Sequence, residues 1–331
     1  MKKLLVMAVA LVMIISSACA FAEQAELEDD MLLSRISLTT GLEKTADDTI
    51  MVAQMDNEPD ARPQMGIGSA DIVYEIELYN GGYTRYTAVF NDNIPEKIEA
   101  IRSTRMVNVD FYLDYGGCFI HFGGQNMAGS NVYEYMKKVD MQAHFDGISD
   151  GSGNFYRDSS RAKPWNVVCK LSNLRDSVDW SQTNQRSPLK FSADNYTVQG
   201  DDVTEFSVEY RSSYVPSYVY NADDGLYYRY YNDKEYKDGI TGEQITCSNV
   251  IVQYVDYSWY DGASDRPIVA TTGTNRCEYF IGGKHFTGYW VRDSIKDNTV
   301  YYDDAGNEVI FKAGKTFVQT LKDTKEVTIA Q

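Results

Sequence analysis

Short runs of β-branched and aromatic residues, separated by glycine, aspartate and asparagine, dominate the second half of the chain. They include NVIVQYVDYSWY, RPIVATTG and CEYFIGGKHFTGYWVRD. Runs of this length form strands, and many strands with turn residues between them are typical of sandwiches and barrels. Asp224-Gly225 is a turn pair that predicts a hairpin. The sequence therefore predicts a mostly β C-terminal domain over residues 200–331, of sandwich or barrel type.

Residues 47–190 show a different pattern, in which helical segments separate the strand-like runs. TIMVAQMDN, ADIVYEIELYN and GGYTRYTAVF are strand-like, with a hairpin turn at residues 80–82, and GGCFIHFGG is an apolar strand between glycines. Residues 104–115 carry a rough helical stripe. A second helix has four apolar residues on one face, namely Val132, Tyr135, Met136 and Val139. We predict an N-terminal domain of α/β type and an α+β chain.

The first 22 residues have the layout of a secretory signal peptide. Lys2 and Lys3 precede an apolar run from Leu4 to Ile15, which the small residues of SSACAFA follow. A cationic start, an apolar stretch too short to span a bilayer and a small-residue cleavage region are the parts of such a signal. We therefore expect an extracytoplasmic protein, in which the acidic residues 23–46 form a tether.

Two ways of processing this signal stay open. Cleavage after Ala20 or Ala22 gives a secreted protein, whereas lipidation of Cys19 anchors the protein to the outer face of the cytoplasmic membrane. Ser16 stands where a lipoprotein motif normally has a Leu-like residue. No later run is apolar enough to cross a bilayer, so a lipid on Cys19 is the membrane attachment that we predict.

The charge of the chain excludes one class of function. It carries 48 acidic residues against 31 Lys and Arg, a net charge of -17, and no basic stripe with aromatic residues occurs. Such a surface repels phosphate backbones, so we exclude nucleic-acid binding.

We predict neither a metal nor a cofactor. The cysteines after residue 22 form no CxxC pair, and the loop DGISDGSGN has Ile148 and Arg157 where an EF-hand needs ligands. Disulfides are compatible with export but not required, so two pairings stay open: Cys247 with Cys277, and Cys118 with Cys169.

Several longer stretches resemble a known family. They are NEPDARPQMGIGSADIVYE, GGYTRYTAVF, EKIEAIRSTR, IHFGG, RDSSRAKPWN, DGITGEQITCSNVIV, GYWVRDS and AGNEVIFKAGKTFVQ. Together they resemble the YerB-like envelope lipoproteins of Gram-positive bacteria, whose two domains have no known function. The resemblance implies a membrane-linked extracytoplasmic protein with an α/β-type domain and a β domain, and it implies no reaction. Trp165 and Tyr236 stand where the family is expected to have histidines, which puts any chemistry of those histidines in question here.

The stretch AIRSTR places two arginines close together in this acidic chain. Ser103 or Thr104 could cap a following helix, and the helix N-terminus with Arg102 and Arg105 would then receive a carboxylate or phosphate. The alternative is structural pairing with acids of the same domain. The candidate acids are Glu75, Glu77 and Asp110.

A second basic cluster, RDSSR with the residues that follow it, could clamp one anionic or sugar-like group. A solvated loop is the alternative. We predict that both clusters meet His121 in one cleft, where Gly123 and Gly124 let a ligand approach the backbone. The predicted ligand-binding residues are Glu75, Arg85, Arg102, Ser103, Arg105, His121, Arg157, Arg161 and Asn166.

We expect an exported binding module of the cell envelope rather than an enzyme, and we assign no catalytic residue. His121 lies in an apolar strand, where a hydrogen-bonded core histidine is common. The expected partner is an anionic group of a wall precursor, a glycan or an envelope protein. Two alternatives stay open: a wall-polymer hydrolase or transferase acting through His121 and Glu75, and a scaffold that docks wall-synthesis enzymes through its β domain.

Overall fold

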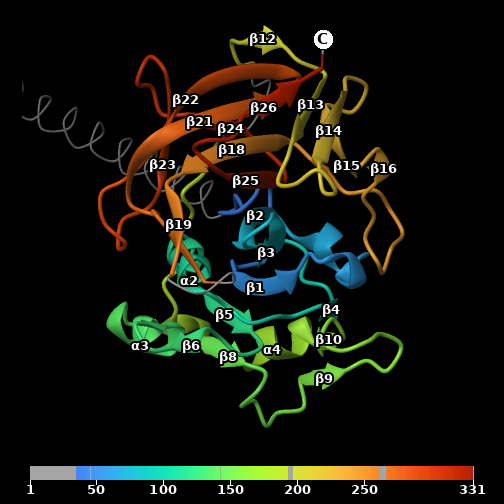
Figure 1. Ribbon diagram of the computed structural model, residues 1–331, viewed down its shortest axis with the longest axis vertical. Coiled ribbons are helices and arrows are strands. Elements are labelled where there is room, and N and C mark those ends of the chain that lie inside the picture. Colours follow the sequence, from blue (N-terminus) through green and yellow to red (C-terminus); the bar gives the residue numbers. More distant parts are fainter. Residues whose placement is uncertain (1–34, 45, 142, 193–196, 261–265, 331) are drawn as a thin grey trace, which may run out of the picture.

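A mixed sheet of 11 strands forms the centre of the molecule. The computed structural model describes residues 35–44, 46–141, 143–192, 197–260 and 266–330. The fold is mainly β, with 44% strand and 11% helix. The strand order of the large sheet is β12-β22-β21-β18-β25-β2-β3-β1-β5-β8, with β23 beside β22. In Figure 1 the sheet runs along the long axis, from orange and red C-terminal strands to blue and green N-terminal strands.

The N-terminal half contributes one end of this sheet. Its strands are β1 (Met51–Asp56), β2 (Ile72–Tyr79), β3 (Tyr83–Phe90), β5 (Cys118–His121) and β8 (His144–Asp146). β3 pairs antiparallel with β1 and β2, whereas β5 and β8 extend the sheet in parallel. The predicted hairpin at residues 80–82 is confirmed, because Gly81 and Gly82 turn the chain between β2 and β3 with positive φ angles of 104° and 84°.

The C-terminal half contributes the other end. Its strands in the large sheet are β12 (Asp201–Asp202), β18 (Asn249–Val255), β21 (Gly273–Ile281), β22 (Lys284–Arg292), β23 (Val300–Asp303) and β25 (Thr316–Lys322). β25 pairs in parallel with β2, in a register that runs from Ile72 opposite Thr316 to Ile76 opposite Thr320. Strand pairing therefore joins the two halves into one continuous sheet.

A smaller, six-stranded sheet packs against the large one. It contains β13 (Glu205–Val208), β14 (Pro216–Asn221), β15 (Leu226–Tyr231), β16 (Lys234–Glu235), β17 (Thr246–Cys247) and β26 (Val327–Ile329). The predicted hairpin at Asp224-Gly225 connects β14 and β15. Phe206 of the small sheet stacks on Phe280 of the large sheet, with ring centroids 3.5 Å apart. A C-terminal half made mostly of strands is what the sequence predicted.

Short helices cover the N-terminal part of the sheet. α2 (Met106–Leu113) and α3 (Val132–Lys138) pack on one face, and α4 (Leu171–Ser177) packs on the other with the small sheet. α3 begins after Asn131, whose side chain accepts hydrogen bonds from two backbone N–H groups of its first turn. Both predicted helices are present. No helix in the described ranges has the length and apolar character to cross a membrane.

The remaining elements are short. The 3₁₀ helices are η1 (Pro59–Ala61), η2 (Ile67–Ser69) and η3 (Trp180–Gln182). β4 (Ile98–Glu99), β10 (Val167–Cys169) and β9 (Phe155–Arg157) form a three-stranded sheet. The two-stranded pairs are β6 (Asn126–Met127) with β7 (Ser130–Asn131), β11 (Lys190–Ser192) with β24 (Ile310–Lys312), and β19 (Tyr257–Trp259) with β20 (Pro267–Val269).

Part of the predicted tether is packed against the folded chain. Residues 1–34, which include the predicted signal peptide and Cys19, lie outside the described residues. Residues 36–43 close a small turn on the N-terminal half, where Thr39 is buried and donates to Asp71 Oδ2 at 2.9 Å. Hydroxyl groups in this polar segment can satisfy buried carboxylates, which composition alone did not reveal.

The four cysteines that the structure describes are free and buried. Neither of the disulfide pairings left open by the sequence is present. Burial raises the pKa of Cys118 and Cys247 to about 12, so their thiols stay protonated at neutral pH. The described part of the fold is held by packing and strand pairing without a disulfide.

These thiols should be protected in the native protein. We expect Ellman's reagent to react slowly with Cys118, Cys169, Cys247 and Cys277 in native buffer, and to label all four in concentrated guanidinium chloride. Intact mass before and after labelling provides the count. Fewer than four labels after unfolding without reductant would reveal a disulfide and contradict this assignment.

Candidate functional site

Arg102 is neutralised inside the N-terminal half. Its Nε lies 2.6 Å from Oδ2 of Asp56, a fully buried carboxylate at the end of β1. The acids proposed from the sequence have other partners: Glu75 pairs with Arg229, Glu77 pairs with Lys322, and Asp110 accepts from Tyr135 and Thr271. Structural pairing was one of the two alternatives left open for Arg102, but the acid differs from the candidates and lies 46 residues earlier in the sequence.

Helix α2 begins one or two residues later than the predicted caps imply. Arg105 occupies the N-cap, and its backbone N–H donates to Oδ1 of Asn108 at 2.8 Å. Ser103 and Thr104 therefore do not cap the helix; Ser103 Oγ instead donates to the Phe122 carbonyl at 3.1 Å. The Asn108 side chain, in the first turn of the helix, accepts from the N–H of the N-cap residue, whereas the sequence predicted that a hydroxyl residue would cap this helix.

Arg85, on β3, brings a further guanidinium to the segment before α2. Its side chain is 1% exposed, and it donates to the Ser103 carbonyl at 2.7 Å and to the Tyr79 hydroxyl at 2.6 Å. Its Nε has no hydrogen-bond partner, and no carboxylate in the described ranges forms an ion pair with it. Arg229 and Arg292, which are equally buried, pair with Glu75 and Asp114.

The second basic cluster meets the first at Phe122. Arg157 donates to Asn166 Oδ1 at 2.8 Å, and its guanidinium lies 5.1 Å from the centroid of the Phe122 ring. The Phe122 backbone N–H donates to the Arg102 carbonyl at 3.1 Å. The structure thus brings Arg157 and Asn166 close to the AIRSTR segment, whereas a common cleft of both clusters with His121 stays a prediction.

Arg161 points elsewhere. Its Nη atoms donate to the carbonyls of Ala61 and Pro63, each at 2.7 Å, and its Nε lies 3.7 Å from buried Glu99. Nearby, the Trp165 indole donates to Glu58 Oε2 at 3.0 Å. Both side chains hold the RDSSRAKPWN loop against η1 and the residues beside it.

His121 is a buried histidine with partners on both ring nitrogens. Nδ1 lies 3.0 Å from the Gly123 carbonyl, which requires Nδ1 to carry the hydrogen, and Nε2 lies 3.3 Å from Nδ1 of His144. Asp146 is 4.0 Å from Nδ1 and accepts from Tyr133. Burial lowers the pKa of His121 to about 4, so the ring is neutral at physiological pH. Glu75 has separate partners, which leaves the proposed His121–Glu75 acid–base pair without support.

The lowered pKa of His121 makes the fold sensitive to acid. In the unfolded chain this histidine has its ordinary pKa of 6.5, whereas burial in the folded chain lowers its pKa to about 4. Stability should therefore fall as the pH is lowered from about 6.5 to about 4. Urea unfolding of wild type and His121→Asn across this range checks the prediction: the variant should show the smaller dependence on pH, and equal slopes would contradict it.

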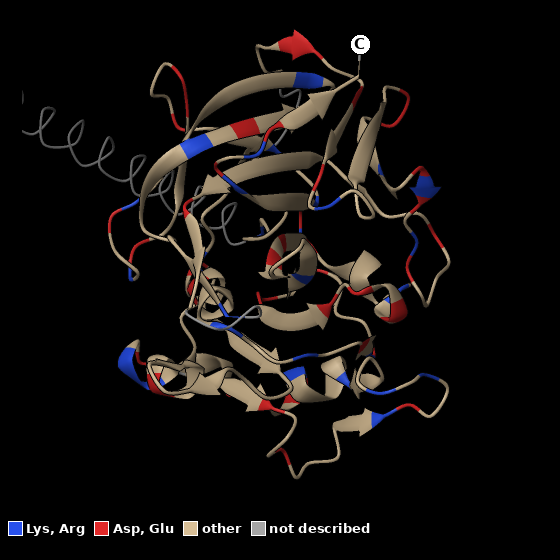
Figure 2. Cartoon of the chain, in the orientation of Figure 1, with Lys and Arg blue, Asp and Glu red and all other residues tan. Residues whose placement is uncertain are grey.

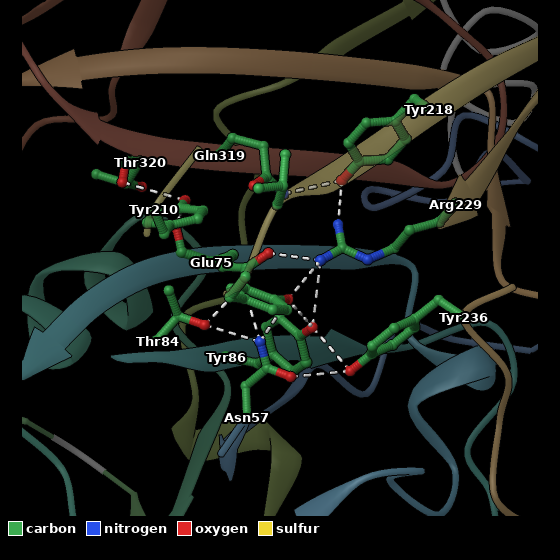
Figure 3. Close-up of polar contacts among 12 residues, drawn as sticks. Asn57, Glu75, Thr84, Tyr86, Tyr210, Tyr218, Arg229, Tyr236, Gln319 and Thr320 are labelled. Atoms are coloured by element: carbon green, nitrogen blue, oxygen red, sulfur yellow. Dashed lines mark hydrogen bonds and ion pairs between the residues drawn. The ribbon is translucent and has the colours of Figure 1, made fainter. Parts of the chain in front are cut away.

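Glu75 belongs to a buried polar cluster between the two halves of the molecule. Its Oε2 accepts from Arg229 Nη2 at 2.6 Å, and both residues are fully buried (Figure 3). The other carboxylate oxygen accepts from Asn57 and Thr84 at 2.8 and 2.7 Å. Glu75 lies on β2 of the large sheet and Arg229 lies on β15 of the small sheet, so this ion pair joins the sheets.

Phenol groups complete the cluster. Tyr218 and Tyr214 accept from Arg229, and Tyr86 donates to Tyr236 at 2.8 Å. Burial raises the pKa of Tyr86 well above its ordinary value, so it stays a neutral hydroxyl. Tyr236, at one of the two positions where a histidine was expected, is a part of this interior network. The cluster is buried and connects the two sheets, and it is not an accessible site.

Removing one partner of the Glu75–Arg229 ion pair should be strongly destabilising. Glu75→Gln leaves Arg229 buried without a counter-charge, and we expect a loss of about 3–5 kcal/mol in the free energy of unfolding. The double variant Glu75→Leu/Arg229→Met should lose less free energy of unfolding than the two single variants lose together. Glu308→Gln, which removes a surface pair with Lys190, is the control and should change stability by less than about 1 kcal/mol. Urea denaturation measures these differences; a wild-type midpoint for Glu75→Gln would contradict the role of the pair.

Two hollows lie where the halves meet. One, of about 240 Å³, is lined by α2, the end of α3, residues 184–186 and the loop between β22 and β23. The other, of about 190 Å³, is more polar and is lined by η2, residues 238–246 and Lys315. None of the nine predicted ligand-binding residues lines either hollow. Within the described ranges, no group of three or more His, Cys, Asp or Glu side chains could hold a metal ion.

Family models match both halves. The model described as "Protein of unknown function (DUF3048) N-terminal domain" matches residues 39–184, and its C-terminal counterpart matches residues 206–318. The chain belongs to the YerB-like DUF3048 family. The predicted domain limits, 47–190 and 200–331, are close to these matches but stay predictions, because strand pairing joins the two halves.

This DUF3048 protein is similar to YerB of Bacillus subtilis, both in sequence and in structure. A protein of strain 168 named "Putative lipoprotein YerB" is 25% identical over 295 residues, which are 84% of this chain and 82% of that protein. The crystal structure of YerB superposes with a TM-score of 0.77 at 21% identity and covers 89% of this chain and 99% of that one. The structural likeness shows a shared fold, and the family description assigns no activity.

Proposed function

We propose that the protein is an exported binding module of the cell envelope, which holds an anionic group of a wall precursor, a glycan or a partner protein next to helix α2. The name of its relative, "Putative lipoprotein YerB", supports the envelope location, as does the signal-like N-terminus. The binding site would comprise Arg85 and the segment from Ser103 to the first turn of α2.

The observation that carries this proposal is the charge of Arg85. A guanidinium does not lose its proton in a protein, and a buried charge without an opposite charge is costly. Arg85 is 1% exposed and forms no ion pair with a described carboxylate, and its hydrogen bonds go to a carbonyl and a phenol. An anion from outside the chain would compensate this charge.

The position of Arg85 strengthens the argument. It contacts Ser103, two residues before the N-cap of α2, and the N-terminal end of a helix carries a partial positive charge. A guanidinium here adds to that charge, whereas an anion would interact favourably with both. Arg102 contributes little, because Asp56 already pairs with it. Arg157, which reaches the same segment through Phe122, could supply a further donor.

The Arg85 site should bind small anions. We expect inorganic phosphate to raise the melting temperature of the wild-type protein and to bind in calorimetry, since a ligand of the folded state stabilises it. Arg85→Met should weaken phosphate binding about tenfold or more, the effect of losing a charged hydrogen bond. Arg85→Lys, which keeps the charge, should lose less phosphate affinity than Arg85→Met.

The matched control is Arg175→Met, which removes an exposed arginine of α4 that is paired with Asp176. This variant should bind phosphate as the wild type does. Absence of phosphate binding by the wild type, or equal affinity of wild type and Arg85→Met, would overturn the proposal. Near-UV circular dichroism of each variant separates loss of binding from loss of folding.

A further inference from the structure

The 240 Å³ hollow between the halves has an apolar lining and a basic edge. Its apolar residues come from the ends of α2 and α3 and from the β22–β23 loop; they are Tyr112, Leu113, Val139, Met141 and Ile295. Arg186 and Lys296 are its basic residues, and Asp140 is its acidic one. Concave sites with apolar walls and a few polar groups, located between domains, are typical of small-molecule sites.

Arg186 holds the walls of this hollow in place. Its Nε and Nη2 both donate to the Leu113 carbonyl, at 3.2 and 2.5 Å, and its Nη1 donates to the Lys296 carbonyl at 3.1 Å. One side chain thus connects the C-terminal end of α2 with the β22–β23 loop of the other half. The side chain of Asn298 also donates to the Ser187 carbonyl across the same boundary, at 2.9 Å. The hollow is therefore built into the fold before any ligand arrives.

The charge of Arg186 is only partly compensated. Its three hydrogen bonds go to carbonyl oxygens, and it forms no ion pair with a carboxylate in the part of the chain that the structure describes. Asp114, the nearby buried acid, pairs with Arg292 at 3.5 Å and interacts with Arg186 only at longer range. The C-terminal end of α2 supplies roughly half a negative charge. With Lys296 beside it, the hollow keeps a net positive edge in a chain whose net charge is -17.

We propose that this hollow binds a single aliphatic chain that ends in an acidic group, such as a medium-chain carboxylate. The apolar walls would bury the chain, and Arg186 and Lys296 would attract its anionic end. Neither a neutral aliphatic molecule nor a short anion would make both interactions. The site is separate from the Arg85 site, because the hollow lies at the opposite end of α2 and none of its lining residues contacts Arg85.

Decanoate is a suitable probe for this site. We expect calorimetry with the full chain to give saturable decanoate binding, with decanol and acetate each binding at least tenfold more weakly. Met141→Trp and Ile295→Trp, which fill the hollow from its two sides, should each reduce decanoate affinity about tenfold or more. Lys296→Glu, which reverses a charge at the edge of the hollow, should also weaken decanoate binding.

Two controls make the result specific. Lys234→Glu makes the same charge change on exposed β16 and should leave decanoate affinity unchanged. Arg85→Met should also leave it unchanged, so that failure of this proposal and failure of the phosphate site are distinguishable. Unaltered decanoate binding in both tryptophan variants, or equal binding of decanol and decanoate, would overturn the inference.

Discussion

The ion pair of Glu75 and Arg229 determines how the two halves of this protein fit together. It is fully buried, and one charge comes from the large sheet and the other from the small sheet (Figure 3). Asn57 and Thr84 donate to Glu75, and three tyrosines accept hydrogen bonds from the Arg229 Nη atoms. Moving the sheets apart would break this ion pair and leave the charges of Glu75 and Arg229 buried without a partner, which is costly. The strand pair β2–β25 adds a second connection beside it, because Glu75 itself lies opposite Gln319 in that pair. Relative movement of the halves is therefore disfavoured, and hollows at their boundary keep a fixed shape.

Because acidic residues outnumber basic ones in this chain, an arginine that has no carboxylate partner is a candidate for binding an external anion. Figure 2 shows acidic and basic residues scattered over both halves of the molecule, and many arginines have an acid partner. Arg102, the residue that first suggested an anion site, is one of these. Arg85 and Arg186 differ, because their donors go to carbonyl and hydroxyl oxygens. An arginine whose charge is paired with a carboxylate of the chain has a structural role, whereas an arginine without such a carboxylate is a candidate for binding. Whether arginines lie close together in the sequence does not distinguish the two cases.

The local features of the fold were predictable from the sequence, and the long-range ones were not. Glycine-containing turns at residues 80–82 and 224–225 and the apolar face of α3 depend on neighbouring residues, so pattern and propensity identify them. The pairing of β2 with β25 joins residues more than 240 positions apart, and no local pattern encodes it. The same reason explains why the partners of Glu75 and Arg102 were missed. Arg85 was among the predicted residues, but its importance depends on burial, which the sequence does not give.

Helix α2 connects the two proposed sites, and its dipole affects them differently. It has eight residues and is therefore about 12 Å long. Arg186 lies at its C-terminal end, where a cation is favourable, so part of its charge is already compensated by the Leu113 carbonyl. Arg85 lies near its N-terminal end, where a cation is unfavourable and an anion is favourable. The need for an external anion should therefore be greater at Arg85, whereas at Arg186 the apolar walls must supply most of the affinity. This difference predicts a small anion at one end and an amphiphile at the other.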